Sequence, residues 1–168
     1  MNKAMNEMTA KPVQLFRQLD DLPDALRGAV LALGNFDGVH FGHQAVIAKA
    51  RQTANALGCP LGVMLFDPHP RQFFAPDAPA FRLTRLATRA RLLAEIGVDF
   101  TLALPFDAAM AASEAEDFIH DSLRGALDIR GVAIGHDFCF GKGRRGDVSM
   151  LEKFGAEHSF EVILTHAE

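Results

Sequence analysis

The segment from Ala29 to His43 constrains this chain more than any other. An apolar run, Ala29 to Leu33, predicts a buried strand, and a glycine-rich turn separates it from a helical pattern that begins at about Gly42. The first backbone N–H groups of a helix have no partner within the helix, and aligned peptide dipoles place partial positive charge there. This strand-to-helix junction therefore favours an anion, above all a phosphate group.

Two histidines, His40 and His43, occupy the junction with the spacing His-x-Gly-His. Imidazole N–H groups at a helix start are suited to stabilise charge that develops on phosphate oxygens, so we interpret both as catalytic. The alternative is a pair of turn histidines, one of which caps the helix. Asp37 precedes them, and its carboxylate either orients a histidine or a Mg²⁺-bound water, or only caps the turn.

Composition limits the class of protein and of partner. A chain of 168 residues, 49% hydrophobic and 23% charged, is long enough for one globular domain. Its net charge of −4 gives no support for a nucleic-acid partner, so an anionic ligand must be held locally. The sequence contains neither an apolar run of membrane-spanning length nor a signal peptide, which leads us to expect a cytoplasmic protein.

Two residue types indicate what the interior offers. Cys59 and Cys139 lack metal-site spacing, and we interpret them as reduced, partly buried thiols. The chain has 14 phenylalanines but no tryptophan or tyrosine, so aromatic contacts with a flat ligand must come from phenylalanine.

Hydrophobic periodicity predicts alternating strands and helices. We expect strands at 29–33, 61–66, 100–104, 131–134 and 160–165, a further short strand at 13–16, and helices at 42–57, 84–96, 113–124 and 148–154. The helix at 113–124 is predicted to start with a capping box at Ser113, and Arg85, Arg89 and Arg91 to form a solvated face. This alternation predicts an α/β fold, a Rossmann-like, mostly parallel five-stranded sheet with helices on both faces.

Ligands of such sheets bind outside the carboxyl ends of the strands, so the loops after the first, second and fourth predicted strands matter most. After the second strand, Pro68 and Pro70 restrict the backbone around Asp67 and His69. This segment either faces a ligand or is a stiff surface loop.

The loop from Gly135 to Asp147 combines glycines with three cations, Lys142, Arg144 and Arg145. That composition suits a mobile loop that closes over phosphates, and Phe138 or Phe140 suits packing against a flat ring. The alternative is a flexible turn with solvated charges.

These motifs resemble those of a known family. Gly34-x-Phe36-Asp37-x-x-His40-x-Gly42-His43 is similar to the signature of the nucleotidylyltransferase superfamily. The full run from Gly34 to Gln44, the Phe-Asp-Pro-His-Pro run and the 135–147 loop resemble the adenylyltransferase module of bacterial bifunctional riboflavin kinase/FAD synthetases. The resemblance implies transfer of AMP from Mg·ATP to FMN, which yields FAD and pyrophosphate.

The resemblance also implies roles for individual residues, with Mg²⁺ carried by ATP and no metal held by the protein alone. Nucleotide binding is expected at Gly34, Asn35, Phe36, Asp37, Gly42, Gly135 and Asp137. Flavin or phosphate binding is expected at Asp67, His69, Phe138, Phe140, Lys142, Arg144 and Arg145. Two alternatives stay open: a nucleotidylyltransferase for another phosphate acceptor, and a non-catalytic module that binds flavin or adenine nucleotide.

The chain departs from this family pattern in one respect. A Ser-Ser-Thr-x-x-Arg segment and a β-barrel riboflavin kinase domain, both expected from the resemblance, have no counterpart in these residues. We therefore expect a polar leader at 1–11, a C-terminally incomplete adenylyltransferase domain at 12–168, and the riboflavin kinase domain as its missing covalent partner.

Overall fold

One sheet of six parallel strands organises the computed structural model, which describes residues 12–39, 41–79 and 85–165. The predicted parallel α/β sheet is confirmed, with one strand more than the five expected. The additional strand is β1, which lies within the short strand predicted at 13–16 and pairs with β4 through Leu15–Thr101 and Phe16–Leu102. The order across the sheet is β1 (Leu15–Phe16), β4 (Phe100–Leu104), β3 (Leu61–Phe66), β2 (Val30–Leu33), β5 (Gly131–Gly135) and β6 (Glu161–Thr165).

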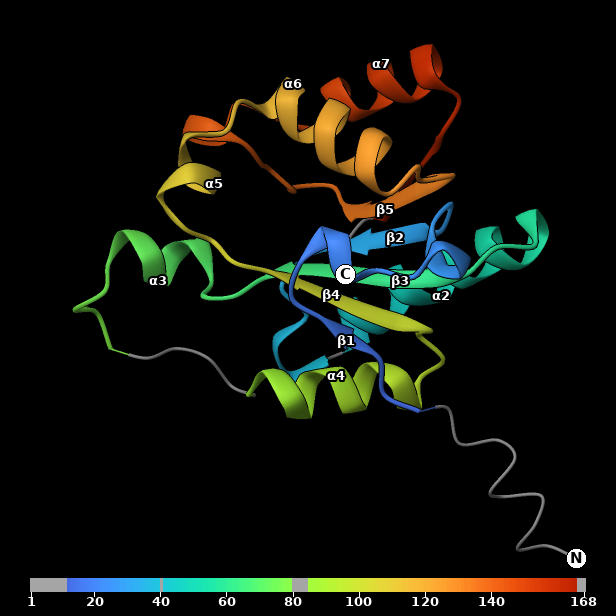
Figure 1. The fold of residues 1–168 in the computed structure, drawn as a ribbon, viewed down its shortest axis with the longest axis horizontal. Coiled ribbons are helices and arrows are strands. Elements are labelled where there is room, and N and C mark those ends of the chain that lie inside the picture. Colours follow the sequence, from blue (N-terminus) through green and yellow to red (C-terminus); the bar gives the residue numbers. More distant parts are fainter. Residues whose placement is uncertain (1–11, 40, 80–84, 166–168) are drawn as a thin grey trace, which may run out of the picture.

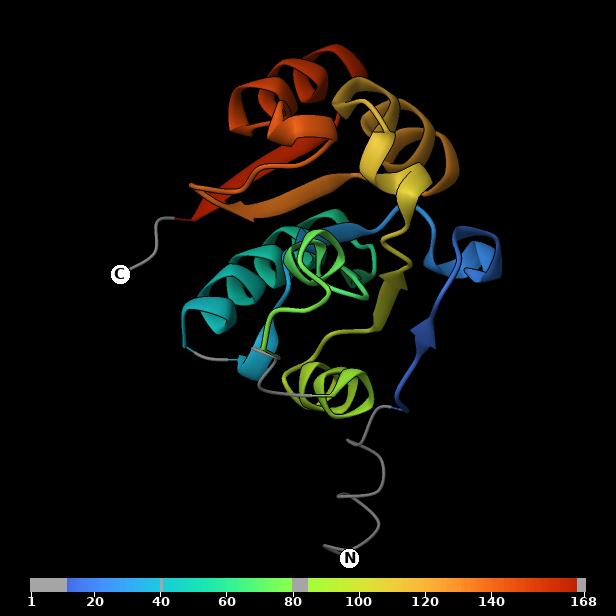
Figure 2. The same ribbon diagram turned by 90° about the vertical axis from the view of Figure 1, so that its left-hand side faces the viewer.

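Helices cover both faces of this sheet, as the alternation of strands and helices predicts (Figures 1 and 2). One face carries α2 (Phe41–Leu57) and α4 (Leu86–Glu95). The other carries α6 (Ala115–Asp117), which continues into the π-helix η4 (Phe118–Ala126), and α7 (Val148–His158). The shorter elements are α3 (Pro70–Phe74), α5 (Ala108–Ala112), η1 (Leu19–Asp21), η2 (Asp24–Leu26), η3 (Asp37–Val39) and η5 (Lys142–Arg144).

Alternate residues of each central strand enter two separate apolar cores. In β2, Val30 packs on the face of the sheet that is covered by Ile47 of α2 and Leu93 of α4. Its neighbour Leu31 packs on the opposite face, in the core that contains Leu123 of η4. Since side chains of a strand alternate between faces, a continuous apolar run is what a parallel sheet covered on both sides requires.

The predicted capping box at Ser113 is wrong. The short helix α5 comes first, capped by Asp107, whose Oδ1 accepts a hydrogen bond from the Met110 N–H at 2.9 Å. Ser113 ends that helix, because its own N–H donates to the Met110 carbonyl at 3.1 Å. The next helix therefore begins one residue later, after Glu114, which makes no side-chain capping bond.

Other elements also differ from the prediction. The proline-rich loop contains the helix α3, with Pro70 at its first position, where the missing N–H of proline costs nothing. The last helix continues to His158, four residues beyond the predicted end. The second long helix begins at Leu86, and Thr84, its predicted first residue, lies outside the described residues.

The order of the strands locates the ligand edge. The chain runs from β2 through β3 to β4 on one side, and then returns to place β5 on the other side of β2. The loops after β2 and β5 therefore diverge at the carboxyl edge, the position where open parallel sheets bind ligands. No helix in the described part of the chain combines the length and apolar character needed to span a membrane.

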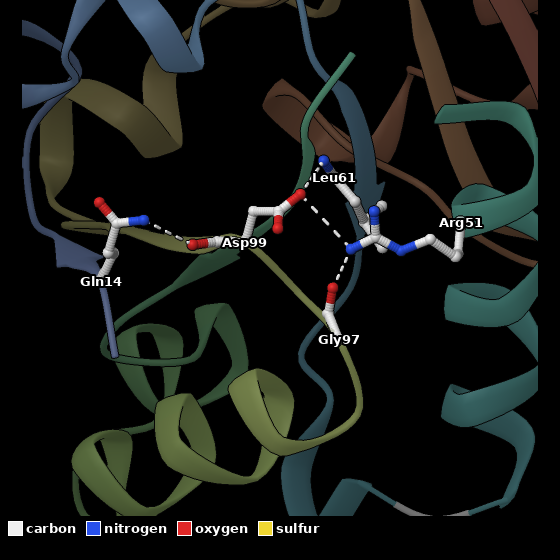
Figure 3. A network of polar contacts seen from close by, with 5 residues as sticks. All are labelled: Gln14, Arg51, Leu61, Gly97 and Asp99. Carbon is white, nitrogen blue, oxygen red and sulfur yellow. Dashed lines mark hydrogen bonds and ion pairs between the residues drawn. The ribbon is translucent and has the colours of Figure 1, made fainter. Parts of the chain in front are cut away.

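A polar network joins the elements at the opposite edge of the sheet (Figure 3). One carboxylate oxygen of Asp99, Oδ2, accepts hydrogen bonds from the Leu61 N–H at 2.9 Å and from Arg51 at 3.4 Å. Arg51 also donates to the Gly97 carbonyl, and Gln14 donates to the Asp99 carbonyl at 3.0 Å. Asp99 thus links the amino ends of β3 and β4 to α2 and to the segment before β1.

We expect Asp99→Ala to lower the free energy of unfolding by about 1–3 kcal/mol, because the fully buried Leu61 loses the acceptor for its N–H. Asp99→Asn should cost less, since the amide oxygen still accepts that bond. Urea unfolding of both variants measures the difference. Asp77→Ala, at an exposed position, is the control; a loss for Asp99→Ala no larger than for this variant would contradict the role.

Candidate active site

Four loops meet in one cavity of about 810 Å³ at the carboxyl edge of the sheet. Gly34 and Asn35 line it from the loop after β2, and residues 69–71, 74 and 75 from the segment after β3. The segment after β4 contributes Phe106 and Met110, and the loop after β5 contributes residues 137–141, 143 and 144. The structure therefore brings together the three loops singled out from the sequence, and adds the one after β4.

The glycine-rich turn after β2 is shaped by a buried phenylalanine. Phe36 adopts a left-handed backbone conformation with φ of 55°, and its ring is 2% exposed in the core below the turn. A Cβ atom at Gly34 would lie 3.2 Å from that ring, closer than most Cβ contacts in proteins. Phe36 therefore supports the turn from beneath, while Gly34 and Asn35 form its cavity-facing part.

The structure describes only one of the two histidines that were predicted to be catalytic. His40 lies outside the described residues. His43 lies in the first turn of α2, with its Nδ1 atom buried and its ring edge-on to Phe36 at a centroid distance of 5.2 Å. Asp37 begins η3 and Gly42 lies in α2 between the two histidines. None of the described residues of this group lines the cavity directly.

The turn also rests on a cation that the sequence analysis assigned to the solvated surface. Arg85 and Arg91 are exposed as predicted, but Arg89 is 2% exposed. Its Nη1 donates hydrogen bonds to the backbone oxygen of Asn35 at 3.0 Å and to Asn35 Oδ1 at 3.1 Å. The prediction for Arg89 is wrong because Leu86, Ala90 and Leu93 place it on the apolar stripe of α4, a spacing that was available in the sequence.

His69 lines the cavity in a defined protonation state. It caps α3, and its Nδ1 accepts a hydrogen bond from the Arg71 N–H at 3.0 Å. Since an accepting ring nitrogen carries no proton, the neutral ring must carry its proton on Nε2. Burial, followed by the charges of Arg71 and Arg89, lowers the pKa of His69 from 6.5, and Asp37 opposes this shift. Asp67, by contrast, forms an ion pair with Arg17 at 3.1 Å and does not line the cavity.

The loop after β5 is held at several points. Phe140 and Gly146 exchange backbone hydrogen bonds of 3.1 and 2.8 Å, and the Lys142 N–H donates to the Ser113 carbonyl at 2.8 Å. Gly141, with φ of +76°, lies so close to Ala115 that a Cβ atom would come within 2.7 Å of it. These contacts attach the loop to the start of α6, a constraint that the expectation of a mobile loop did not include.

The side chains of this loop divide into two groups. Asp137, Phe138, Phe140 and Arg144 line the cavity, with the two phenylalanine rings stacked at a centroid distance of 5.9 Å. Gly135, Lys142 and Arg145 lie outside the lining, and Arg145 forms a long ion pair with Glu114 at 3.9 Å.

An aromatic wall completes the cavity, and its rings are not among the residues predicted to bind flavin. Phe106 packs edge-on against Phe66 at 5.5 Å and against Phe74 at 5.9 Å, and all three rings line the cavity. The ring of Phe74 is 68% exposed, an unusual exposure for a large apolar side chain. The wall therefore offers a flat ligand apolar surface that is not consumed by the protein core.

Comparison with known proteins identifies the family. The FAD synthetase family model matches residues 22–167. The chain belongs to the FAD synthetase family. The bifunctional riboflavin kinase/FMN adenylyltransferase of Escherichia coli K12 is 43% identical over 154 residues, which cover 91% of this chain and 49% of that protein. The protein of the same name from Pseudomonas fluorescens is 40% identical over 150 residues, which cover 89% and 48%.

The chain thus spans about half the length of the curated relatives that it matches. Two solved structures share its fold. A macrolide-efflux protein from Streptococcus pneumoniae aligns with a TM-score of 0.77 at 24% identity, over 92% of this chain and 50% of that one. A pantoate-beta-alanine ligase from Francisella tularensis, complexed with beta-gamma ATP and beta-alanine, aligns with a TM-score of 0.57 at 12% identity, over 94% and 68%. At these identities the likeness concerns the fold alone.

Potential metal ligands do not cluster in the part of the chain that the structure describes. Among the described residues there is no group of three or more His, Cys, Asp or Glu side chains that is arranged to hold a metal ion. Cys59 and Cys139 are free, partly buried thiols, as predicted.

We expect His69 of the folded protein to titrate below pH 6.5, and lower still in Asp37→Asn, which removes the charge that opposes the shift. The unfolded chain binds this proton at a higher pH, so His69 contributes stability above pH 6.5 that is lost as the pH falls through its folded pKa. Two-bond ¹H–¹⁵N NMR measures both the pKa and the Nε2–H tautomer. Asp77→Asn is the control, and an Nδ1–H tautomer would contradict the assignment.

Proposed function

We propose that this chain transfers AMP from ATP to the phosphate of FMN, and so forms FAD and pyrophosphate. The observation that carries the proposal is a single cavity that has the glycine-rich turn at one side and a wall of phenylalanine rings at the other. The turn suits phosphate groups and the wall suits a flat ring system. The relatives carry FMN adenylyltransferase in their names, which supports this pairing of substrates.

The reaction requires positioning and charge stabilisation more than proton transfer. A phosphate oxygen of FMN attacks the α-phosphorus of ATP, the bond from that phosphorus to the bridging oxygen breaks, and pyrophosphate leaves. A phosphate monoester loses its second proton at a pKa of about 6, so the attacking group is ionised at neutral pH without a base. The magnesium ion arrives as part of the Mg·ATP substrate, with Asp37 proposed to orient one of its waters.

The proposed ATP site is the turn after β2 and the start of α2. Gly34 and Asn35 face the cavity, and Gly42 and Asp37 belong to the same junction. His40 and His43 are proposed to donate hydrogen bonds to the phosphate oxygens as charge develops on them. Gly135 ends β5 and Asp137 follows it at the point where the loops diverge, and both are proposed to contact the nucleotide from the other side.

The proposed FMN site is the remaining part of the cavity. Phe74, Phe106 and Phe138 are proposed to offer ring surface to the flavin, and Phe140, which is 6% exposed, supports Phe138 by stacking against it. His69 presents a neutral N–H donor at this wall, and Arg144 supplies a cation. We leave the riboflavin kinase activity in the relatives' names unassigned to these residues, because the match covers about half of each relative.

We expect the chain to form FAD and release pyrophosphate when it is incubated with FMN and Mg·ATP. Chromatographic detection of FAD and an enzymatic assay for pyrophosphate measure the two products. Phosphopantetheine and nicotinamide mononucleotide, offered separately in place of FMN, are the controls and should release far less. Release with one of these acceptors alone would indicate another nucleotidylyltransferase, and binding of FMN and ATP without release would indicate a binding module.

We expect His43→Ala, and likewise His40→Ala, to lower kcat on the order of 100-fold with a much smaller change in the KM for Mg·ATP. The reason is that these N–H groups act on charge that appears in the transition state. Steady-state kinetics measure the two constants separately. His158→Ala, on α7, is the matched control. Equal changes in kcat and KM, or no change, would contradict the catalytic role.

A further inference from the structure

Arg89 is a buried cation with no part in the mechanism described so far. Its side chain ranks among the largest that are almost fully enclosed, at 2% exposure, on the apolar face of α4. Taking a guanidinium group out of water is costly unless it is well hydrogen-bonded. Its Nη1 donates to both oxygens of Asn35, a residue that lies 54 positions earlier in the chain and lines the cavity.

The chemistry of these bonds orients Asn35. Guanidinium has donors and no acceptor, so the atom of the Asn35 amide that faces Nη1 must be its oxygen. The amide NH₂ group is then the part of the side chain that is left to face a ligand. The backbone carbonyl of Asn35 points at Arg89 as well, and in a trans peptide the following N–H points the opposite way. The N–H of Phe36 is therefore directed away from Arg89.

The charge of Arg89 also reaches the cavity. Arg89 does not line the cavity, yet its charge is among the causes that lower the pKa of His69 on the cavity wall. The protein interior screens charge far less than water does, so a buried cation acts over several ångströms. In a chain of net charge −4, this cation favours anions at the one place where the proposed reaction needs them.

We propose that Arg89 is a positioning residue of the active site, which holds Asn35 with its N–H groups toward the substrate and sets a fixed positive charge behind the phosphate-binding turn. This inference rests on the proposed function and adds a residue that acts on the substrate through Asn35. This positioning role differs from a purely structural one, because it requires both the hydrogen bonds from Arg89 to the two oxygens of Asn35 and the positive charge of Arg89.

The test uses three variants of the full chain, assayed for FAD formation. Arg89→Met keeps the length of the side chain and removes its charge and donors, and Arg89→Lys keeps the charge without the planar fork. Arg91→Met, at an exposed position on the same helix, makes the same change in net charge. We expect a loss of kcat on the order of 10-fold to 100-fold for Arg89→Met, the size that hydrogen bonds to a charged group imply.

We expect a smaller loss of kcat for Arg89→Lys and none for Arg91→Met. In an Asn35→Ala background, Arg89→Met should cost less than it does alone, because the part of its effect that passes through Asn35 is already lost and only the part due to its charge remains. Additive losses, or a wild-type kcat in Arg89→Met, would overturn the inference and leave the proposed function intact. If Arg89→Met does not fold, Arg89→Lys is combined with Asn35→Ala instead. The losses of kcat in the two single variants and in the double variant are then compared in the same way.

A second readout does not depend on activity. By NMR, the pKa of His69 should rise in Arg89→Met, stay low in Arg89→Lys, and stay unchanged in Arg91→Met. A His69 pKa that is the same in all three variants would overturn the claim that the charge reaches the cavity. Absence of FAD formation by the wild-type chain would overturn the proposed function, and with it the role of Arg89 in catalysis.

Discussion

The pairing of β2 with β3 on one side and β5 on the other is the constraint on which the site depends. Because all of these strands are parallel, their carboxyl ends share one edge, and the loops that leave β2 and β5 must separate there. The cavity opens at that separation. The Asp99 network joins the strands at the opposite edge, where their amino ends lie.

The cavity combines two environments that a nucleotide and a flavin would each need. The turn after β2 contributes backbone N–H groups and glycine, and its shape is set from below by Phe36. The opposite wall consists of phenylalanine rings, in a chain that has no tryptophan or tyrosine. The chain has a net charge of −4 and so no overall basic excess, and under the proposed function the local placement of a cation such as Arg89 would matter more than the total number of basic residues.

Local sequence patterns predicted the bounds of an element correctly where contacts within that element determine them. The strands at 61–66 and 100–104 coincide with β3 and β4, and the strand-to-helix junction lies at the predicted place. The predictions were wrong where contacts with another segment determine the structure. Ser113 lies in a sequence that is typical of a helix start. It instead ends α5, the short helix that Asp107 caps at its beginning. Arg89 is of a residue type that is usually exposed. It lies on the apolar stripe of α4, however, and is buried where it hydrogen-bonds to Asn35.

The sequence by itself determined the alternation of strands and helices, the glycine turn and the residue types available at the ligand edge, because each of these follows from near neighbours in the chain. It also carried the motifs by which the family was recognised. The tertiary structure alone decided which of those residues share a cavity: His69 and Arg144 do, whereas Asp67 turns to Arg17 and Arg145 to Glu114. Such partners lie far apart in the sequence, and periodicity contains no information about contacts between distant segments.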